Sequence, residues 1–367
     1  MRVKFISFII IVSVLFVSFS TSQENPQWKG KIEYEDGIEV IKNPKQPMYG
    51  EDVFSIDEDL SIGVAEGKNE YVFFHLSYLA VDDQETIYAM DQGEKLVKVY
   101  DKKGNFLRTI GKKGEGPGEL QNPDDIFIIN TNNLVIEDFI RNISYFSTTG
   151  KYIRSLSTTK IFPIEVILNS QGYILSITNI NAPNKWGKEI SLYDENLWYL
   201  KTIISVPQPK PNPQILKPFQ PKINMSSYKD DYFIVSFKEE YELQIFNLKG
   251  ELVKKIIQEY KPIKVTEEDV KISVGQVSKE RKLIVPSYFP AIYSFTTDDE
   301  GRIFVHTYEK DGNGKRFIDV FDQEGRYIAK ISLKDRPIVW KNGKLYTIEE
   351  DEDGFHVIKR YKVTWNY

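Results

Sequence analysis

Short runs in which apolar and polar residues alternate recur along this chain, and a polar turn joins each run to a second one of the same kind. Alternation with a period of two on both sides of a turn that contains Gly or Asn is typical of a β-hairpin, because these residues tolerate a positive φ angle. Five such units occur: VKVYDKKGNFLRTIG (97–111), ISYFSTTGKYIRSL (143–156), ISLYDENLWYLKTI (190–203), LQIFNLKGELVKKI (243–256) and IDVFDQEGRYIAKI (318–331). The pattern therefore predicts five hairpins.

A further pair of alternating runs precedes each hairpin. These pairs span 79–91, 126–138, 166–179, 225–237 and 293–308. A pair and its hairpin make four antiparallel strands, and tandem four-stranded units predict the blades of a propeller. The intervals between successive turn residues are 46, 46, 54 and 75 residues, so the later units carry inserted loops; the turn residues are Gly104, Gly150, Asn196, Gly250 and Gly325.

The C-terminal segment supplies only three strands of a sixth blade, at 336–340, 344–350 and 356–365. Two spare alternating segments lie near the N-terminus, at 29–42 and at 51–63. One of them can complete the last blade and remove the open edges of the ring, which would otherwise favour aggregation. We therefore predict an all-β, six-bladed propeller of four-stranded antiparallel blades whose last blade is closed by an N-terminal strand.

The N-terminus has the composition of a secretory signal peptide. Arg2 and Lys4 precede an apolar run at 5–19 and then small residues, which predicts a signal at 1–22 that is cleaved before Gln23. The run is shorter than the roughly 20 residues of a membrane span, so an uncleaved anchor is the less favoured alternative. Residues 23–367 then form a single propeller domain, with strands within 29–63 contributing to ring closure.

The chain contains no cysteine. It therefore lacks a lipid-attachment cysteine and disulfides, and its stability must come from buried apolar surface. We expect a protein exported to the periplasm or the cell exterior, which is not a lipoprotein and is not held at a membrane after signal cleavage. The formal charge is −5, and it becomes −7 without Arg2 and Lys4, which disfavours nucleic acid as a partner. We expect a monomer.

The stretch IGKKGEGPGELQNPDDIFI (110–128) resembles the linker between blades in NHL-type six-bladed β-propellers. Two other segments, YEDGIEVIKNP (34–44) and VPSYFPAIYSFTTDDEGRIFV (285–305), look like parts of exported bacterial six-bladed propellers. The resemblance implies the fold and a bacterial source. The wider NHL-like superfamily includes lactonases, lyases and interaction scaffolds, so the resemblance by itself does not choose a function.

In each of the six predicted blades one residue ends the second strand, and these six residues should gather around one mouth of the central channel. They are Asp91, Asp138, Asn179, Lys238, Tyr308 and Glu350. Oxygen ligands from such a ring could hold Ca²⁺, with Asp91, Asp138 and Glu350 as its ligands, although Lys238 opposes a bound cation. Most other Asp residues, such as Asp322, lie in predicted turns, where their side chains stabilise the backbone.

The long connections all fall on one face of the predicted disc. They are 111–122, the proline-rich 207–222, 258–290, 180–188 and 309–315, whereas the connections on the other face are short. Long loops are usually functional or disordered, so the elaborated face is the predicted binding face. Trp186, Tyr288 and Phe289 on this face could form a recognition surface, or they could hold the loops against the disc.

These observations leave three functions open. We favour a non-catalytic exported propeller that binds a protein, small-molecule or glycan ligand through the elaborated face. The alternative is a divalent-cation-dependent, lactonase- or lyase-like enzyme with its site at the channel mouth, where His306 or Tyr308 would act as the acid or base. A third possibility is a structural module that assembles into a stable oligomer. No cofactor other than Ca²⁺ is expected.

Overall fold

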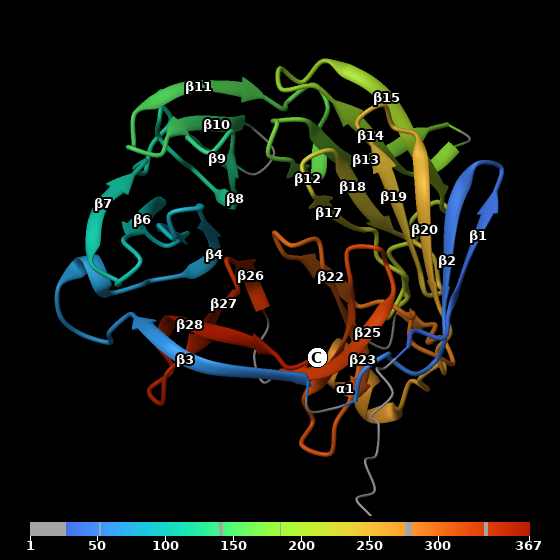
Figure 1. The fold of residues 1–367 in the computed structure, drawn as a ribbon. Helices are drawn as coiled ribbons and strands as arrows, with labels where there is room; N and C mark the ends of the chain where they lie inside the picture. The colour runs from blue at the N-terminus through green and yellow to red at the C-terminus, as the bar shows by residue number, and fades with distance from the viewer. Residues whose placement is uncertain (1–26, 51–52, 139–141, 184, 276–280, 334–336) are drawn as a thin grey trace, which may run out of the picture.

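The computed structural model describes residues 27–50, 53–138, 142–183, 185–275, 281–333 and 337–367. Six β-sheets stand around a central axis as the blades of a propeller (Figure 1), which confirms the predicted fold. The signal peptide predicted at 1–22 lies outside the described residues. Within the described ranges, no helix is long and apolar enough to cross a membrane.

Three blades follow one another directly along the chain. Blade one contains β4 (Leu76–Val81), β5 (Ile87–Asp91), β6 (Leu96–Tyr100) and β7 (Phe106–Ile110). Blade two contains β8 (Pro123–Ile129), β9 (Asn133–Asp138), β10 (Asn142–Ser147) and β11 (Tyr152–Ser157). Blade three contains β12 (Pro163–Leu168), β13 (Ile174–Ala182), β14 (Lys185–Tyr193) and β15 (Tyr199–Pro207).

Two of the remaining three blades, four and six, include strands from the N-terminal region. Blade four contains β17 (Asn224–Tyr228), β18 (Tyr232–Ser236), β19 (Glu242–Asn247) and β20 (Leu252–Gln258), extended by β1 (Lys31–Glu35) and β2 (Ile38–Asn43). Blade five contains β22 (Ser294–Thr297), β23 (Ile303–Lys310), β24 (Arg316–Phe321) and β25 (Tyr327–Leu333). Blade six contains β26 (Pro337–Lys341), β27 (Lys344–Glu350), β28 (His356–Trp365) and β3 (Phe54–Ile62).

An N-terminal strand closes the ring, as predicted. Strand β3 pairs antiparallel with β28, the last strand of the chain, from Phe54 opposite Trp365 to Ile62 opposite Ile358. The centroid of the Phe54 ring lies 4.9 Å from that of Trp365, so β3 and β28 also meet through an aromatic contact. Of the two spare segments, the closing strand therefore comes from 51–63.

The other spare segment, 29–42, extends blade four instead of closing blade six. Strands β1 and β2 form a hairpin whose turn residues Asp36 and Gly37 have φ angles of 51° and 83°, as a two-residue turn of this type requires. Strand β2 pairs in parallel with β20, so blade four has six strands rather than the four that were predicted. This placement buries Val40 and Ile41 completely, which explains why the hairpin stays on the disc.

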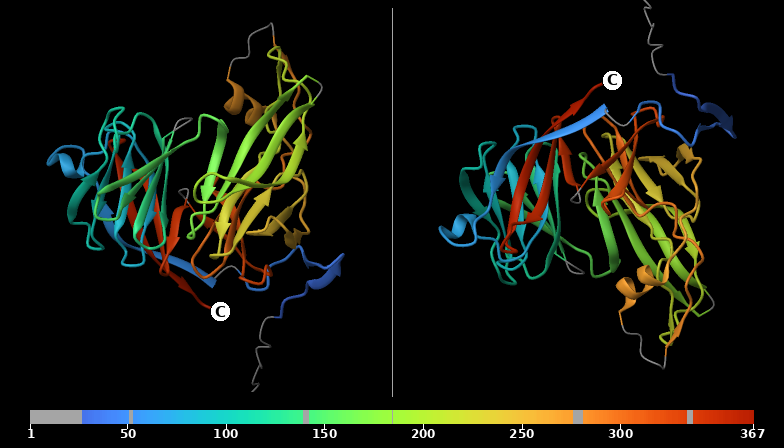
Figure 2. Two further views of the ribbon diagram at one scale, coloured as in Figure 1. Left: turned by 90° about the horizontal axis from the view of Figure 1, so that it is seen from above. Right: turned by 90° about the horizontal axis from the view of Figure 1, so that it is seen from below.

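Of the predicted long loops, 180–188 is mainly strand, whereas 309–315 is mainly a tight turn. Strands β13 and β14 continue through the first, and β23 reaches Lys310 before a tight turn leads into β24. In the second loop the Asp311 carboxylate accepts hydrogen bonds from the backbone N–H groups of Asn313 and Lys315, which favours a turn over an open loop. The long strands β13, β14 and β15 of blade three make their side of the disc taller than the opposite side (Figure 2).

A short helix and a two-stranded sheet complete the tall side. Helix α1 (Glu267–Val274) begins at Thr266, whose hydroxyl accepts from the backbone N–H of Asp269, while the Asp269 carboxylate accepts from the backbone N–H of Thr266. Strands β16 (Ile215–Leu216) and β21 (Lys282–Leu283) pair in parallel. This pairing connects the proline-rich segment to the region that follows α1.

Apolar side chains form six buried clusters, and each cluster lies between two neighbouring blades. Between blades five and six, for example, the ring of Phe304 stacks on that of Trp340 with 4.0 Å between their centroids. The blades therefore depend on one another for burial, because each sheet shares its apolar faces with its neighbours.

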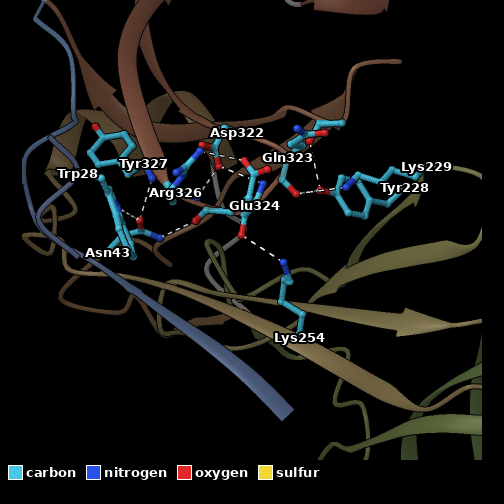
Figure 3. Close-up of polar contacts among 12 residues, drawn as sticks. Trp28, Asn43, Tyr228, Lys229, Lys254, Asp322, Gln323, Glu324, Arg326 and Tyr327 are labelled. Carbon is cyan, nitrogen blue, oxygen red and sulfur yellow. Dashed lines mark hydrogen bonds and ion pairs between the residues drawn. The ribbon is translucent and has the colours of Figure 1, made fainter. Parts of the chain in front are cut away.

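Asn43 at the end of β2 links the N-terminal hairpin to blade five (Figure 3). Its Oδ1 accepts hydrogen bonds from Trp28 Nε1 at 2.9 Å and from the backbone N–H of Tyr327 at 2.8 Å. Its Nδ2 donates to the carbonyl oxygen of Gly325 at 2.9 Å. One buried amide thus joins three separate segments.

We expect Asn43→Ala to destabilise the protein by about 2–3 kcal/mol, because it leaves a buried backbone N–H and a buried carbonyl without partners. The free energy of unfolding in urea measures the loss. Asn132→Ala is the matched control, because Asn132 is exposed in a turn. Equal stabilities for the two variants would contradict this assignment.

Candidate functional site

Of the six residues predicted to ring the channel mouth, Asp91, Asp138 and Glu350 end the second strand of their blades, at the edge where the innermost strands begin, and Lys238 follows its strand. Asn179 and Tyr308 lie inside their strands, which continue to Ala182 and Lys310. Asp91 lies opposite Leu76 at the start of β4, and Asp138 lies opposite Pro123 at the start of β8. The contacts of the six residues nevertheless differ, so the blades do not present the same metal-ligating side chain at this edge.

Asp91 is completely buried, and the nearby backbone occupies its carboxylate. Oδ2 accepts from the N–H of Phe74 at 2.9 Å, and Oδ1 accepts from the N–H groups of His75 and Gly93 at 3.0 Å. Lys98 Nζ lies 3.8 Å from Oδ2. Asp91 therefore holds the chain in place as it enters the first blade.

Asp138 has the same role in blade two. Its Oδ2 accepts from the N–H of Gln121 at 2.8 Å, and its Oδ1 accepts from the N–H of Asn122 at 2.5 Å. The glycine-rich linker before β8 ends at these two residues. A carboxylate at the end of the second strand thus fixes the preceding linker in both blades, which a pattern of residue types along the chain does not reveal.

The other four positions have separate surroundings. Asn179 is exposed and lies opposite Lys188, Lys238 forms an ion pair of 2.7 Å with Glu242, and Glu350 is exposed beside His356. Tyr308 belongs to an aromatic group described below. Among the described residues, no three His, Asp or Glu side chains are arranged to hold a metal ion. The Ca²⁺ site therefore stays a prediction.

A cavity of about 1250 Å³ opens on the elaborated face above blades three to five. We call residues 207–222 the strap and this space the strap cavity. Its walls are the strap, the ends of strands in the three blades and one side of α1. The lining includes Ile164, Glu165, Lys188, Pro207, Lys210, Lys217, Phe219, Lys222, Phe237, Asp269, Ile272, Phe289, Tyr293, Tyr308, Lys310 and Arg316.

Aromatic rings and cations form one connected group in the wall of the strap cavity. The Arg316 guanidinium lies over the rings of Tyr293 and Tyr308, 4.4 Å and 5.3 Å from their centroids. Phe289 stacks on Tyr308 at 4.3 Å, and Lys222 Nζ lies 5.6 Å from the centroid of Tyr293. Contacts of this kind hold cationic side chains in place without neutralising their charge.

The cations of the strap cavity lack carboxylate partners. Within the part of the chain that the structure describes, no carboxylate oxygen lies within 4.0 Å of a charged nitrogen of Lys188, Lys210, Lys217, Lys222, Lys310 or Arg316. The two acidic residues of the lining are Glu165 and Asp269, and Asp269 is committed to capping α1. A protein with a net charge of −5 thus carries a positive cavity.

The predicted aromatic residues Trp186, Tyr288 and Phe289 lie at or near the strap cavity. Lys210 Nζ of the strap lies 5.5 Å from the centroid of Trp186, and the Trp186 carbonyl accepts from the N–H of Gln208. Tyr288 lines a second cavity of about 1260 Å³ between blades four and five, and Phe289 lines both cavities. These residues therefore contribute to cavity walls and also hold loops in place.

Sequence reasoning missed a group of carboxyl residues between blades two and three. Glu137 on β9 lies directly opposite Asp125 on β8, next to Asp124, and Glu165 belongs to β12. Burial, and then the nearby charges of Asp125, Asp124 and Glu165, raise the pKa of Glu137 to about 8. Burial likewise raises the pKa of Glu165 and of Asp124. Glu137 and Asp125 are directly opposite each other on two paired strands. The expected register of the two strands is therefore the signal that could have placed these carboxyl groups together.

Fold and cavity together define a six-bladed β-propeller with a basic, aromatic cavity on its elaborated face. The DUF5128 family, a 6-bladed beta-propeller family, matches residues 66–355, and the chain belongs to this family. No curated protein matches the sequence.

Two solved structures share the fold. One is a putative exported protein from Bacteroides fragilis, with a TM-score of 0.57 and 10% identity over 89% of this chain and 100% of that chain. The other is a member of the DUF4221 family from Bacteroides vulgatus, with a TM-score of 0.54 and 10% identity over 86% of this chain and 100% of that chain. At this identity the likeness concerns the fold alone.

We expect Asp91→Ala to lower the free energy of unfolding by about 3–5 kcal/mol, because three backbone N–H groups lose their common acceptor and the buried Lys98 ammonium loses one of its two carboxylate neighbours. Urea unfolding with EDTA and with added Ca²⁺ measures the loss, and Asp91→Asn, which retains one oxygen, should show a smaller one. If the loss appears only with Ca²⁺, Asp91 is instead a cation ligand.

We expect Glu137→Gln to remove a pH dependence of stability. The folded state binds a proton at Glu137 up to a pKa of about 8, whereas the unfolded state releases it near the ordinary value of 4.5. Unfolding free energy therefore falls as pH rises from 4.5 to about 8. The variant should melt at the same temperature as the wild type near pH 4.5, and about 5 °C higher than the wild type above pH 8.

Melting curves of both proteins across this pH range provide the measurement, with exposed Glu66→Gln as the matched control. A difference in melting temperature that does not change with pH would contradict the role of Glu137.

Proposed function

We propose that the protein is an exported, non-catalytic binding protein that takes its ligand in the strap cavity. The observation that carries the proposal is the set of cations without carboxylate partners around one large cavity. Unpaired cations that converge on a cavity favour an anionic or strongly polar ligand, because such a ligand supplies the missing counter-charges.

The construction of the elaborated face supports this proposal. The strap, helix α1 and the long hairpins of blades three and five all contribute to the strap cavity. The opposite face consists of short turns in which Asp or Asn side chains bind their own backbone, as Asp101 does with Lys103 and Asn105. Additional chain length is therefore concentrated where the cavity lies.

Binding rather than catalysis is favoured by the roles of the carboxylates at the edge of the blades. Asp91 and Asp138, the best candidates for a catalytic cation site, use their oxygens to hold backbone N–H groups. His306 is buried in β23, where it lies opposite Ser294 of β22 and Ile318 of β24. Export is supported by the sequence of residues 1–22 and by the likeness to a putative exported protein.

We expect the strap to be necessary for binding and dispensable for the fold. In the test variant a Gly-Ser linker of equal length replaces residues 208–221, and thermal melts are recorded with a panel of neutral sugars, oligosaccharides and organic anions. A ligand at 100 times its dissociation constant should stabilise the wild type by about 2.7 kcal/mol, and this stabilisation should disappear in the variant. A ligand that stabilises both proteins equally would contradict the proposal.

A further inference from the structure

The strap cavity combines its cations with apolar side chains that are exposed within the described part of the chain. Ile272 on α1 is 74% exposed, and Ile164 on β12 is 38% exposed, although both line the cavity. The strap adds apolar proline rings to the same space, from Pro207, Pro209, Pro211 and Pro221. When an apolar ligand displaces water from apolar surface in a cavity, the burial of that surface stabilises the complex.

The charged end of the cavity is arranged for an acidic group. Arg316 donates one long hydrogen bond, of 3.5 Å from Nη1 to the carbonyl oxygen of Thr307, and its guanidinium plane is held against Tyr293 and Tyr308. A guanidinium has five N–H donors, so most of those on Arg316 have no acceptor among the residues that the structure describes. A carboxylate, sulfate or phosphate matches such a fork with two parallel hydrogen bonds.

Cations and the exposed helix face the same space. The pKa of Asp269 at the start of α1 is lowered mainly by its hydrogen bond from Thr266, and the charges of Lys310 and Arg316 lower it further. Arg316 is therefore close to the helix that carries Ile272. Glu165 is the other acid of the lining; burial raises its pKa, whereas the charges of Lys188 and Lys222 lower it, so these two cations also lie near this carboxyl group.

The aromatic rings of the cavity favour this chemistry over a neutral sugar. Tyr308 has Phe289 stacked on it and Arg316 over its ring, while Tyr293 has Arg316 and Lys222 over its ring. Sugars are commonly held by open aromatic faces, and these two rings are already occupied by cations and by Phe289. The free recognition elements are the cations themselves and the exposed apolar surface.

We propose that the strap cavity binds an amphipathic anion, a ligand with a hydrocarbon body and one carboxylate, sulfate or phosphate group. Arg316 and Lys222 bind the acidic group, and Ile272, Ile164 and the strap prolines cover the body. The inference rests on the proposed binding function and specifies its ligand class. The same chemistry could come from a soluble acid or from a lipid in a membrane, and the partly enclosed cavity favours the soluble acid.

The experiment compares four probes by isothermal titration calorimetry on the purified protein. Decanoate has both features, decanol has the body alone, acetate has the charge alone, and an oligogalacturonate is acidic without a hydrocarbon body. We expect decanoate to bind at least about tenfold more tightly than the other three, since a charge-assisted pair and apolar burial each contribute on that scale.

Three variants separate the parts of the site. Arg316→Gln should weaken decanoate about tenfold and leave decanol unchanged, and Lys222→Gln should act in the same direction. Ile272→Ser should weaken decanoate and decanol alike, by about threefold. The matched controls are Lys103→Gln, outside the cavity, and Ile153→Ser on β11, whose side chain is 49% exposed; both should bind as the wild type does. Melting temperatures confirm that each variant is folded.

Several results would overturn the inference. Equal affinity for decanoate and decanol would remove the anionic requirement, and preference for the oligogalacturonate would replace the ligand class by an acidic glycan. Flotation with phosphatidylglycerol vesicles, without decanoate binding, would assign the face to a membrane surface. Absence of decanoate binding would also refute it. In each case, the proposed function would still be supported if a different ligand bound the wild type and no longer bound the variant with the replaced strap. The failure of this inference and the failure of the proposed function can therefore be told apart.

Discussion

The pairing of β3 with β28 is the constraint on which the rest of the molecule depends. Every buried cluster lies between two blades, so a ring with one incomplete blade would expose apolar surface on both of its neighbours. The strand that completes blade six comes from residues 54–62, more than 290 positions before its partner in the chain. Blade order, and with it the position of every loop on the elaborated face, follows from this closure.

Several buried carboxylates hold segments of this protein together, and their surroundings explain why. Asp91 and Asp138 accept backbone N–H groups in the linkers that lead into their own blades. Asp319 binds the hydroxyl groups of Tyr241 and Tyr327, and so joins blade four to blade five. A buried carboxylate requires such donors, because without them burial would disfavour its charged form.

Charge is distributed unevenly, and this distribution connects the fold to the proposed function. Acidic side chains meet their partners in turns and between blades, as Asp322 does with Arg326. Over the described ranges of the chain the cations of the strap cavity have no such partners, and aromatic rings hold Lys222 and Arg316 in place. A site of this kind attracts an anion although the whole chain is negative, because the local field around the cavity outweighs the distant charges.

The sequence by itself determined the blade count, the hairpin turns, the closing role of an N-terminal strand and the face that carries the long connections. These features depend on local alternation and turn residues, which a single chain displays directly. Only the tertiary structure decided that residues 29–42 extend blade four, that Asp91 and Asp138 are held by backbone, and that Arg316, Lys222 and Ile272 share one cavity. These outcomes depend on contacts between distant segments, because side-chain direction and loop position are set by the closed ring and not by neighbouring residues.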